Sequence, residues 1–368
     1  MNKLGVFLGM ISLYVCFAFV ISLFAAATPL YDVSAASAIL ICADDGRTLY
    51  EKNADVRREM ASTTKIMTAL VAIENGDLNA VVPIADEAVG VEGSSIYLQR
   101  GECMTLSDLL YALLLQSAND AATAIAVHIG GSVNGFSDLM NEKAMQLGLS
   151  DTHFTNPHGL TDPQHYTTAR DLATLAAHAL KNQTFQEICA TKTAKISGGR
   201  TICNHNKLLF RYADTIGVKT GFTKSSGRCL VSAARRDGLT LVAVTLNAPS
   251  DWDDHTTLLD YGFSLYSPVK LADLGEFSFR LPVIGGDKTS VFVRNRDTLT
   301  VSLPKSQNGV VAKIKINRPI FAPVVEGNIL GQVAFYCGGQ LIATLPLYAE
   351  ETAQIPPTPS IWERIFHQ

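Results

Sequence analysis

The sequence lacks the short spacings by which proteins bind zinc or build redox-active cysteine pairs. It contains no Cys-x-x-Cys pair and no His-Glu-x-x-His motif, and it does not indicate how the six cysteines after residue 30 would pair. His153, His158 and His165 lie close together, which keeps a zinc peptidase as an alternative, but no comparable ligand set accompanies them. We therefore expect no metal ion and no cofactor, and histidines that lie at the surface or make local hydrogen bonds.

Charged residues are few and are not concentrated in one sign. They make up 17% of the chain, the net charge is −4, and there is no basic block. A nucleic-acid partner requires a positively charged surface, so we expect none. Hydrophobic residues make up 47%, which excludes a wholly disordered chain. At 368 residues the chain is too long for one ordinary core, and we expect two domains.

Long apolar runs are also absent, except for one at the N-terminus. Lys3 precedes this run and three alanines end it, which is the layout of a secretory signal. We expect a signal peptide over residues 1–27, with cleavage at Ala27 or near Ala36. The run is long enough to span a bilayer, so an uncleaved anchor is the alternative. Either outcome places the body of the protein outside the cytoplasm, in the cell envelope.

Turn residues and periodicity predict helices enclosed by two strand pairs. Residues 37–51 indicate a β-hairpin around Asp45-Gly46, and residues 228–246 indicate a second hairpin around Asp237-Gly238. Four helical runs lie between them, over residues 60–76, 105–116, 121–131 and 136–148. This order predicts an α+β domain over residues 37–267, with a single sheet closed by both ends of the domain.

The remainder of the chain changes character at Pro268. Short β-type runs alternate with turns over residues 268–348, which predicts a small all-β domain. Residues 349–360 read as a proline-rich linker. Residues 361–368 place four apolar side chains on one helical face. This pattern fits either a frayed C-terminal tail or an amphipathic segment that binds weakly at the membrane surface.

A serine and a lysine one helical turn apart stand at the start of the first helical run. Ser62 and Lys65 share a helix face, so the lysine Nζ can reach the serine Oγ. A serine hydroxyl becomes a nucleophile when a base takes its proton, and a lysine is a base only when its amine is neutral. Apolar neighbours favour the neutral amine. The pair alone equally fits a capping serine beside a solvated lysine.

Two further motifs favour the catalytic interpretation. Ser117 and Asn119 fall at the break between two apolar helices, and Lys219-Thr220-Gly221 follows a β-type run. The three motifs occur in the order Ser-x-x-Lys, Ser-x-Asn, Lys-Thr-Gly, with steps of 55 and 102 residues between their first residues. This ordered set resembles the signature of penicillin-binding proteins and serine β-lactamases.

The surrounding sequence resembles the low-molecular-weight D-alanyl-D-alanine carboxypeptidases from about Ser37 to Leu246. The stretches "GSSIYLQRGE", "LLLQSANDAA" and "GVKTGFTKSSGRCLVSAA" carry the likeness. The resemblance implies a transpeptidase-like fold with helices around an antiparallel sheet. It also implies an exported enzyme that removes the terminal D-alanine from peptidoglycan stem peptides through an acyl-enzyme, with β-lactams as inhibitors.

The resemblance also implies roles for individual residues. Ser62 corresponds to the acylated nucleophile, Lys65 to its proton acceptor and Ser117 to the proton relay toward the leaving amine. Asn119 corresponds to the group that grips the substrate amide.

The Lys-Thr-Gly segment corresponds to the carboxylate-binding strand. Lys219 and Thr220 would receive the terminal carboxylate of the substrate, and Gly221 would let the substrate backbone lie close to the strand. The backbone N–H groups of Ser62 and Phe222 would form the oxyanion hole.

Two alternatives share the three motifs. A class A β-lactamase needs a glutamate to activate the deacylating water, and the glutamates between Ser117 and Lys219, Glu142 and Glu187, stand in no matching context. A non-enzymatic β-lactam sensor would carry several membrane spans, and one apolar segment is present. Asp171, in "TTARDLA", fits a helix start better than the acid of a catalytic triad.

Overall fold

The computed structural model describes residues 32–306 and 309–357. The expected signal peptide and C-terminal tail lie outside these residues. The chain divides into two compact units, one formed by residues up to 235 with 240–262, the other by 236–239 with the residues from 263 onward. Within the described ranges, no helix has the length and apolar character needed to cross a membrane.

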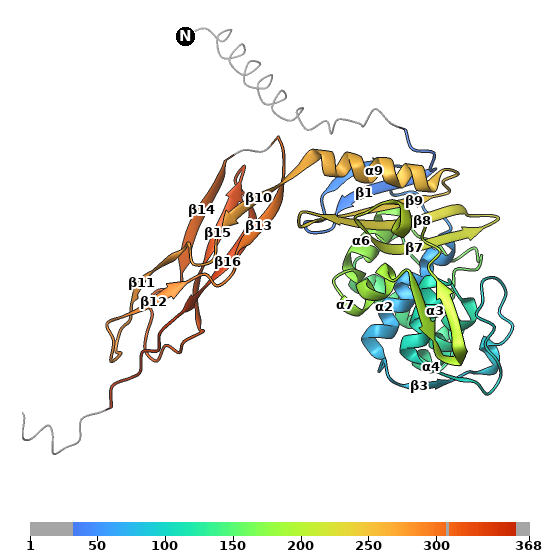
Figure 1. The fold of residues 1–368 in the computed structure, drawn as a ribbon, viewed down its shortest axis with the longest axis horizontal. Coiled ribbons are helices and arrows are strands. Elements are labelled where there is room, and N and C mark those ends of the chain that lie inside the picture. The colour runs from blue at the N-terminus through green and yellow to red at the C-terminus, as the bar shows by residue number, and fades with distance from the viewer. Residues whose placement is uncertain (1–31, 307–308, 358–368) are drawn as a thin grey trace, which may run out of the picture. The chain divides into compact units, whose positions relative to one another are not determined.

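A five-stranded antiparallel sheet organises the first unit, in the order β2-β1-β9-β8-β7 (Figure 1). Its strands are β1 (Ser37–Cys42), β2 (Thr48–Lys52), β7 (Thr215–Thr223), β8 (Gly227–Arg236) and β9 (Leu239–Leu246). Ser37 lies opposite Leu246, so the first strand pairs with the last strand of the sheet. The expectation of one sheet closed by both ends of the domain is confirmed, as are both predicted hairpins.

Helices cover the two faces of this sheet unequally. Figure 1 shows α9 (Asp251–Leu265) along one face and most of the helices on the other. Leu40 points toward α9, where Gly262 leaves room for it, whereas Ile39 joins the helical core on the opposite face. Every residue of β1 is buried because both of its faces are covered. Fully burying such an aliphatic side chain contributes about 1.5–3 kcal/mol.

The other elements of the first unit are helices and short strand pairs. The longer helices are α2 (Lys65–Asn75), α3 (Leu106–Leu115), α4 (Asn119–Gly130), α5 (Val133–Gln146), α6 (Ala169–Ala179) and α7 (Gln183–Ala190). The shorter elements are η1 (Ala61–Thr64), η2 (Asp86–Ala88), η3 (Ser197–Gly199), α8 (Leu208–Arg211), β3 (Val81–Pro83), β4 (Cys103–Thr105), β5 (Thr193–Ile196) and β6 (Arg200–Cys203).

Side-chain caps fix where two of these helices begin. Thr105 Oγ1 accepts a hydrogen bond from the Asp108 N–H at 3.0 Å, which caps the start of α3. Thr168 Oγ1 accepts from the Asp171 N–H at 3.0 Å in the same way. Asp171 therefore stands at a helix start, as expected.

The second unit is all β, as its sequence predicted. Its strands are β10 (Tyr266–Ala272), β11 (Ser278–Pro282), β12 (Ser290–Arg294), β13 (Leu299–Pro304), β14 (Val310–Ile316), β15 (Ile329–Cys337) and β16 (Gln340–Ala349). β10 pairs with β13, and the other five form a sheet in the order β11-β12-β16-β15-β14.

Both ends of this unit differ from the expected boundaries of 268 and 348. Pro268 lies inside β10, because α9 ends at Leu265 and the strand begins directly after it. At the other end, Ala353 is buried and exchanges backbone hydrogen bonds with Val324 at 2.9 Å. The segment from 349 to 354 therefore packs with the β-unit, and the expected linker begins later than residue 349.

Candidate active site

The turn that leads from η1 into α2 brings Ser62 and Lys65 together. Ser62 lies in η1, Lys65 begins α2, and the lysine Nζ lies 2.9 Å from the serine Oγ. The same Nζ lies 2.6 Å from Asn119 Oδ1 and 2.8 Å from the backbone oxygen of His158. Lys65 is completely buried, so its amine has exchanged water for these three partners.

The partners of Lys65 determine where its lone pair points. A neutral amine has two N–H donors and one lone pair, and the oxygens of Asn119 and His158 can only accept. They take both N–H groups, which directs the lone pair toward the hydroxyl of Ser62. In this state the Ser62 O–H donates to the lysine nitrogen.

The electrostatic surroundings favour the neutral amine of Lys65. Burial holds its pKa well below the usual value, and the like charge of Lys219 lowers it further. Asp120 acts in the opposite direction. Lys65 is therefore able to accept a proton at a pH where an exposed lysine is already protonated.

Ser117 and Asn119 enter the site from the break between α3 and α4. Ser117 has a φ of +61°, in the left-handed region that is uncommon for residues other than glycine. Both side chains are buried, at 5% and 4% exposure, and Ser117 lines the cleft. The predicted break between two apolar helices is confirmed, and it directs two polar groups inward.

Strand β7 forms the opposite wall of the site. Thr220 and Phe222 line the cleft, and Phe222 is 65% exposed. A Cβ atom on Gly221 would lie 3.1 Å from the backbone nitrogens of Ser62 and Thr63. The strand thus approaches the start of η1 closely, and a glycine permits that approach.

Lys219 differs from the other residues of its motif. It is 1% exposed, its Nζ donates to the backbone oxygen of Thr220 at 2.8 Å, and it is not among the described residues that line the cleft. Burial lowers its pKa to about 7. The structure therefore places its charge beneath Thr220.

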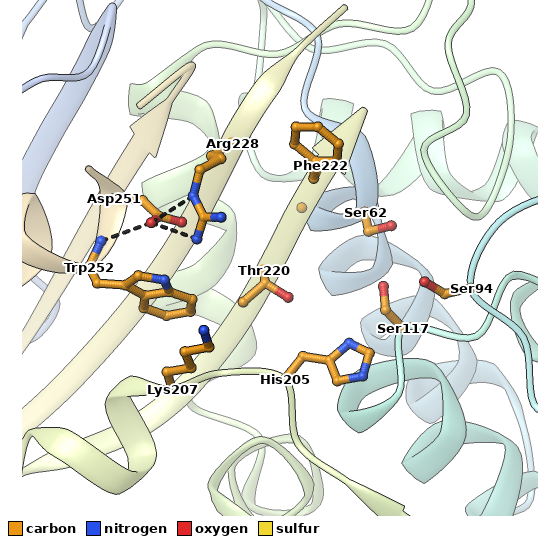
Figure 2. Close-up of a pocket in the computed structure, with 11 residues that line it drawn as sticks. Ser62, Ser94, Ser117, His205, Lys207, Thr220, Phe222, Arg228, Asp251 and Trp252 are labelled. Carbon is orange, nitrogen blue, oxygen red and sulfur yellow. Dashed lines mark hydrogen bonds and ion pairs between the residues drawn. The ribbon is translucent and has the colours of Figure 1, made fainter. Parts of the chain in front are cut away.

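These elements enclose an open cleft of about 330 Å³. It is lined by Ser62, Ser94, Ser117, His205, Lys207, Thr220, Gly221, Phe222, Arg228, Asp251 and Trp252. Figure 2 shows the three serines on one side of β7 and Arg228 with Asp251 on the other, with Thr220 between them.

Six lining residues were not anticipated from the sequence, namely Ser94, His205, Lys207, Arg228, Asp251 and Trp252. Arg228 Nε donates to Asp251 Oδ1 at 2.9 Å, and the guanidinium carbon lies 5.7 Å from the centre of the Trp252 ring. Arg228 comes from β8, and Asp251 and Trp252 from the start of α9, all outside the three motifs. Of the six residues, only Ser94 and Arg228 lie in stretches that carried the family resemblance, "GSSIYLQRGE" and "SSGRCLVSAA".

The three clustered histidines make no metal site. No group of His, Cys, Asp or Glu in the described ranges is arranged to hold a metal ion, and the six cysteines described there are free thiols. Burial lowers the pKa of His158 to about 3 and that of His165 to about 4. His165 Nε2 lies 2.8 Å from Thr64 Oγ1, so this histidine serves local hydrogen bonding, as expected.

Comparison with known proteins identifies the family. Residues 23–250 match the model of the D-alanyl-D-alanine carboxypeptidase family of S11 peptidases, and residues 266–354 match that of the penicillin-binding protein 5 C-terminal domain. The chain belongs to the D-alanyl-D-alanine carboxypeptidase family. It is a serine peptidase of the low-molecular-weight penicillin-binding class.

Individual relatives agree with this assignment along most of the chain. The carboxypeptidase DacF of Bacillus subtilis is 32% identical over 331 residues, which cover 86% of this chain and 85% of that protein. The carboxypeptidase of Streptomyces sp. strain K15 is 39% identical over 244 residues, covering 60% and 84% of the two chains.

Solved structures of the family share the fold. Penicillin-binding protein 5 of Haemophilus influenzae is 29% identical, with a TM-score of 0.67 over 89% of this chain and 99% of that one. PBP3 of Streptococcus pneumoniae is 26% identical, with a TM-score of 0.77 over 88% and 100%. The predicted α+β domain followed by a small all-β domain is confirmed.

Proposed function

We propose that this carboxypeptidase removes the terminal D-alanine from peptidoglycan stem peptides that end in D-Ala-D-Ala, with Ser62 as the nucleophile. The hydrogen bonds of Lys65 carry the proposal. Two acceptor-only oxygens hold its N–H groups, and its lone pair is directed at the Ser62 hydroxyl. That arrangement suits a base that activates a serine.

In the acylation step, the Ser62 Oγ attacks the carbonyl carbon of the scissile bond while its proton passes to Lys65 Nζ. The N–H groups of Ser62 and Phe222 would stabilise the oxyanion that forms. As the tetrahedral intermediate collapses, the C–N bond breaks, and the amine of the leaving D-alanine receives a proton through the Ser117 hydroxyl. The enzyme then carries the shortened peptide as an ester on Ser62.

Deacylation repeats these steps with water as the nucleophile. Lys65, neutral again, takes a proton from the water, whose oxygen attacks the ester carbonyl. The C–O bond to Ser62 breaks and the serine oxygen regains its proton. A β-lactam enters the same first step, but its leaving nitrogen stays tethered to the acyl group.

The carboxylate of the substrate would lie over Thr220. Thr220 lines the cleft, and behind it the buried amine of Lys219 donates a hydrogen bond to the Thr220 backbone carbonyl. Asn119 would orient the substrate amide on the other side of Ser62. A carboxylate fixed at one end orients the scissile bond toward the nucleophile.

The cell envelope is the compartment in which this substrate is found. The predicted signal over residues 1–27 supports export to that compartment. The amphipathic segment over residues 361–368 supports a weak contact with the membrane surface.

Mass spectrometry after incubation with benzylpenicillin tests the function. One penicillin should add per chain. Trypsin cleaves after Arg58 and Lys65, so the label should map to the peptide EMASTTK, which contains Ser62. Label on Ser117 or on a cysteine would contradict the assignment of the nucleophile.

Lys219→Gln should weaken turnover of a peptide ending in D-Ala-D-Ala by about 1.5–3 kcal/mol, the usual worth of a hydrogen bond to a charged group. The loss arises because the variant removes the positive charge that lies behind Thr220 and would attract the carboxylate. The measurement is kcat/KM for the acid and for the same peptide with an amidated C-terminus, which should change much less.

The pH profile of Lys219→Gln reports on the effect of Lys219 on the pKa of Lys65. Lys65 works as the neutral form, so the rate rises as pH increases through its pKa. Removing the like charge of Lys219 raises that pKa, so the acidic limb should move to higher pH. Equal losses on both peptides with an unmoved limb would make Lys219 a structural residue.

A further inference from the structure

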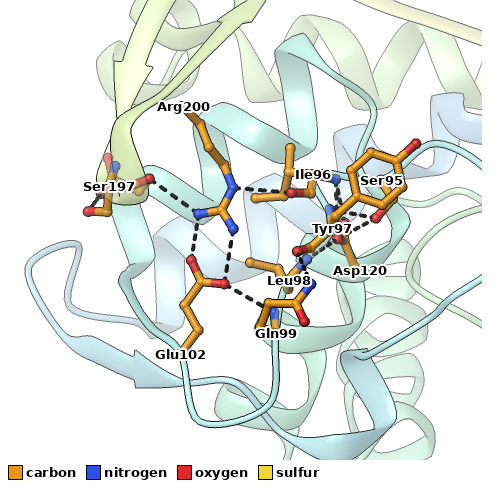
Figure 3. A network of polar contacts seen from close by, with 10 residues as sticks. Ser95, Ile96, Tyr97, Leu98, Gln99, Glu102, Asp120, Ser197 and Arg200 are labelled. Atoms are coloured by element: carbon orange, nitrogen blue, oxygen red, sulfur yellow. Dashed lines mark hydrogen bonds and ion pairs between the residues drawn. The ribbon is translucent and has the colours of Figure 1, made fainter.

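A loop between η2 and β4 lies beside Asn119. We call residues 92–102 the clamp loop (Figure 3). Ser94 lines the cleft, whereas Tyr97 at the outer part of the loop is 78% exposed and has a φ of +60°. A bulky residue at such a φ requires surrounding contacts that impose it.

The inner end of the clamp loop holds Asn119 from two directions. The Asn119 backbone N–H donates to the Ser94 carbonyl at 2.7 Å, and its side-chain Nδ2 donates to the Glu92 carbonyl. Gly93 allows this approach, since a Cβ there would lie 2.7 Å from Nδ2. With Nδ2 engaged by the loop, Oδ1 is left facing Lys65 Nζ at 2.6 Å.

The conformation of the loop depends on Asp120. Its carboxylate is 1% exposed and accepts hydrogen bonds from the Ser95 hydroxyl at 2.6 Å and from the Leu98 N–H at 3.0 Å. It also accepts from the Ile96 N–H at 3.2 Å and from the Ala121 N–H at 2.9 Å. The donors on both sides of Tyr97 therefore converge on one buried anion (Figure 3).

We propose that Asp120 is a positioning residue of the acylation step, because it holds the clamp loop in the conformation that aims Asn119 Oδ1 at Lys65. The proposal rests on the roles of Ser62 and Lys65 proposed above. Without the loop carbonyls, the amide of Asn119 is free to rotate. Lys65 then loses one of the two acceptors that direct its lone pair.

A second contact fixes the outer end of the loop independently. Arg200 on β6 binds both carboxylate oxygens of Glu102, with Nη2 3.0 Å from Oε2, and its Nε donates to the Ile96 carbonyl at 3.1 Å. This ion pair is partly exposed and has no contact with Asn119 or Lys65. Glu102 is therefore a matched control for loosening the loop away from the catalytic groups.

The charge of Asp120 provides a readout that a merely structural role would not change. Two charged groups act on the pKa of Lys65, namely Lys219 from β7 and Asp120 from α4. Two further titratable groups near it are His158 and His165, from the segment before α6. Both histidines have pKa values far below neutrality and stay uncharged. Asp120 is the negative charge that raises the pKa of Lys65.

Asp120→Asn tests the proposal by the rate of benzylpenicillin acylation from pH 5 to 10. We expect the rate at its optimum to fall roughly 10- to 100-fold, the scale of a small displacement of catalytic groups. We also expect the acidic limb to move to lower pH, opposite to the movement expected for Lys219→Gln. An unchanged rate, or a reduced rate with an unmoved acidic limb, would overturn the proposal.

Two variants accompany this measurement. Glu102→Gln should lower thermal stability yet acylate at the wild-type rate, and a loss of rate equal to that of Asp120→Asn would overturn the proposal.

Ser95→Ala keeps the charge of Asp120 and removes one of its hydrogen-bond donors. It should therefore acylate about two- to tenfold more slowly, with the acidic limb of the pH profile unmoved. If Asp120→Asn does not fold, Ser95→Ala takes its place as the test. Acylation by Ser95→Ala at the wild-type rate would then overturn the proposal. Failure of the wild-type chain to label at Ser62 would instead refute the proposed function.

Discussion

Ser62→Ala should leave the protein folded and abolish covalent labelling by penicillin. Alanine removes the oxygen that would form the ester, and among the described contacts Lys65 bonds to no other hydroxyl of the cleft. Lys65 Nζ lies 2.9 Å from Ser62 Oγ and makes no hydrogen bond to Ser117 among the described contacts. The measurement is intact mass after prolonged incubation with excess benzylpenicillin, together with release of D-alanine from a pentapeptide.

Two controls separate this loss from other chemistry. Cys103 and Cys203 are the exposed thiols of the described ranges, so blocking them should leave labelling intact. Ser117→Ala should still acquire label on Ser62, although more slowly, because it lacks the relay and keeps the nucleophile. Persistent labelling of Ser62→Ala would show that the ester forms elsewhere.

Lys65→Arg should reduce acylation by about 10²–10⁴-fold, as expected when a positioned general base is lost. Arginine is positively charged where the working lysine is neutral, and it can still donate to the oxygens of Asn119 and His158. It does not deprotonate in proteins, so it has no lone pair to receive the Ser62 proton. The measurement is the second-order rate constant of acylation under pseudo-first-order conditions.

The pH dependence distinguishes loss of the base from loss of packing. In the wild type, acylation should rise with pH as Lys65 loses its proton, and its lowered pKa brings this rise below the range of an exposed lysine. Lys65→Arg should lack this limb. Lys52→Arg, at a surface ion pair with Asp32, serves as the matched substitution and should behave as wild type. Near-normal acylation by Lys65→Arg would exclude Lys65 as the base.

The parts of the site that could be predicted from sequence are those set by local spacing. Ser62 and Lys65 are three positions apart, which is about one helical turn, so their contact follows from helix geometry. The His158 carbonyl is 93 residues from Lys65 in sequence, and no residue type marks a backbone acceptor. The same limit applies to the carbonyls of Glu92 and Ser94, which hold Asn119 through their backbone atoms.

The burial of Lys219 also could not be anticipated from its motif. Alternation along a strand predicts that Lys219 and Thr220 face opposite sides. Which side receives water depends on what packs there, and Cys189 on α7 lies close enough to influence the pKa of Lys219. The expected boundary near residue 268 came from a change in sequence character, which does not mark a start to the residue. In the structure β10 begins at Tyr266, directly after α9, and Pro268 lies inside this strand.

The pairing of β1 with β9 has a consequence for the order in which the enzyme assembles. Residues 37–42 are among the first of the unit to be synthesised, yet their partners at 241–246 come almost last. Contacts so distant along the chain close late in folding, because the intervening loop must first lose its entropy. β7 reaches the sheet only through β8 and β9. The approach of β7 to η1 therefore depends on the pairing of β9 with β1. The cleft can form only after the chain has been synthesised through β9.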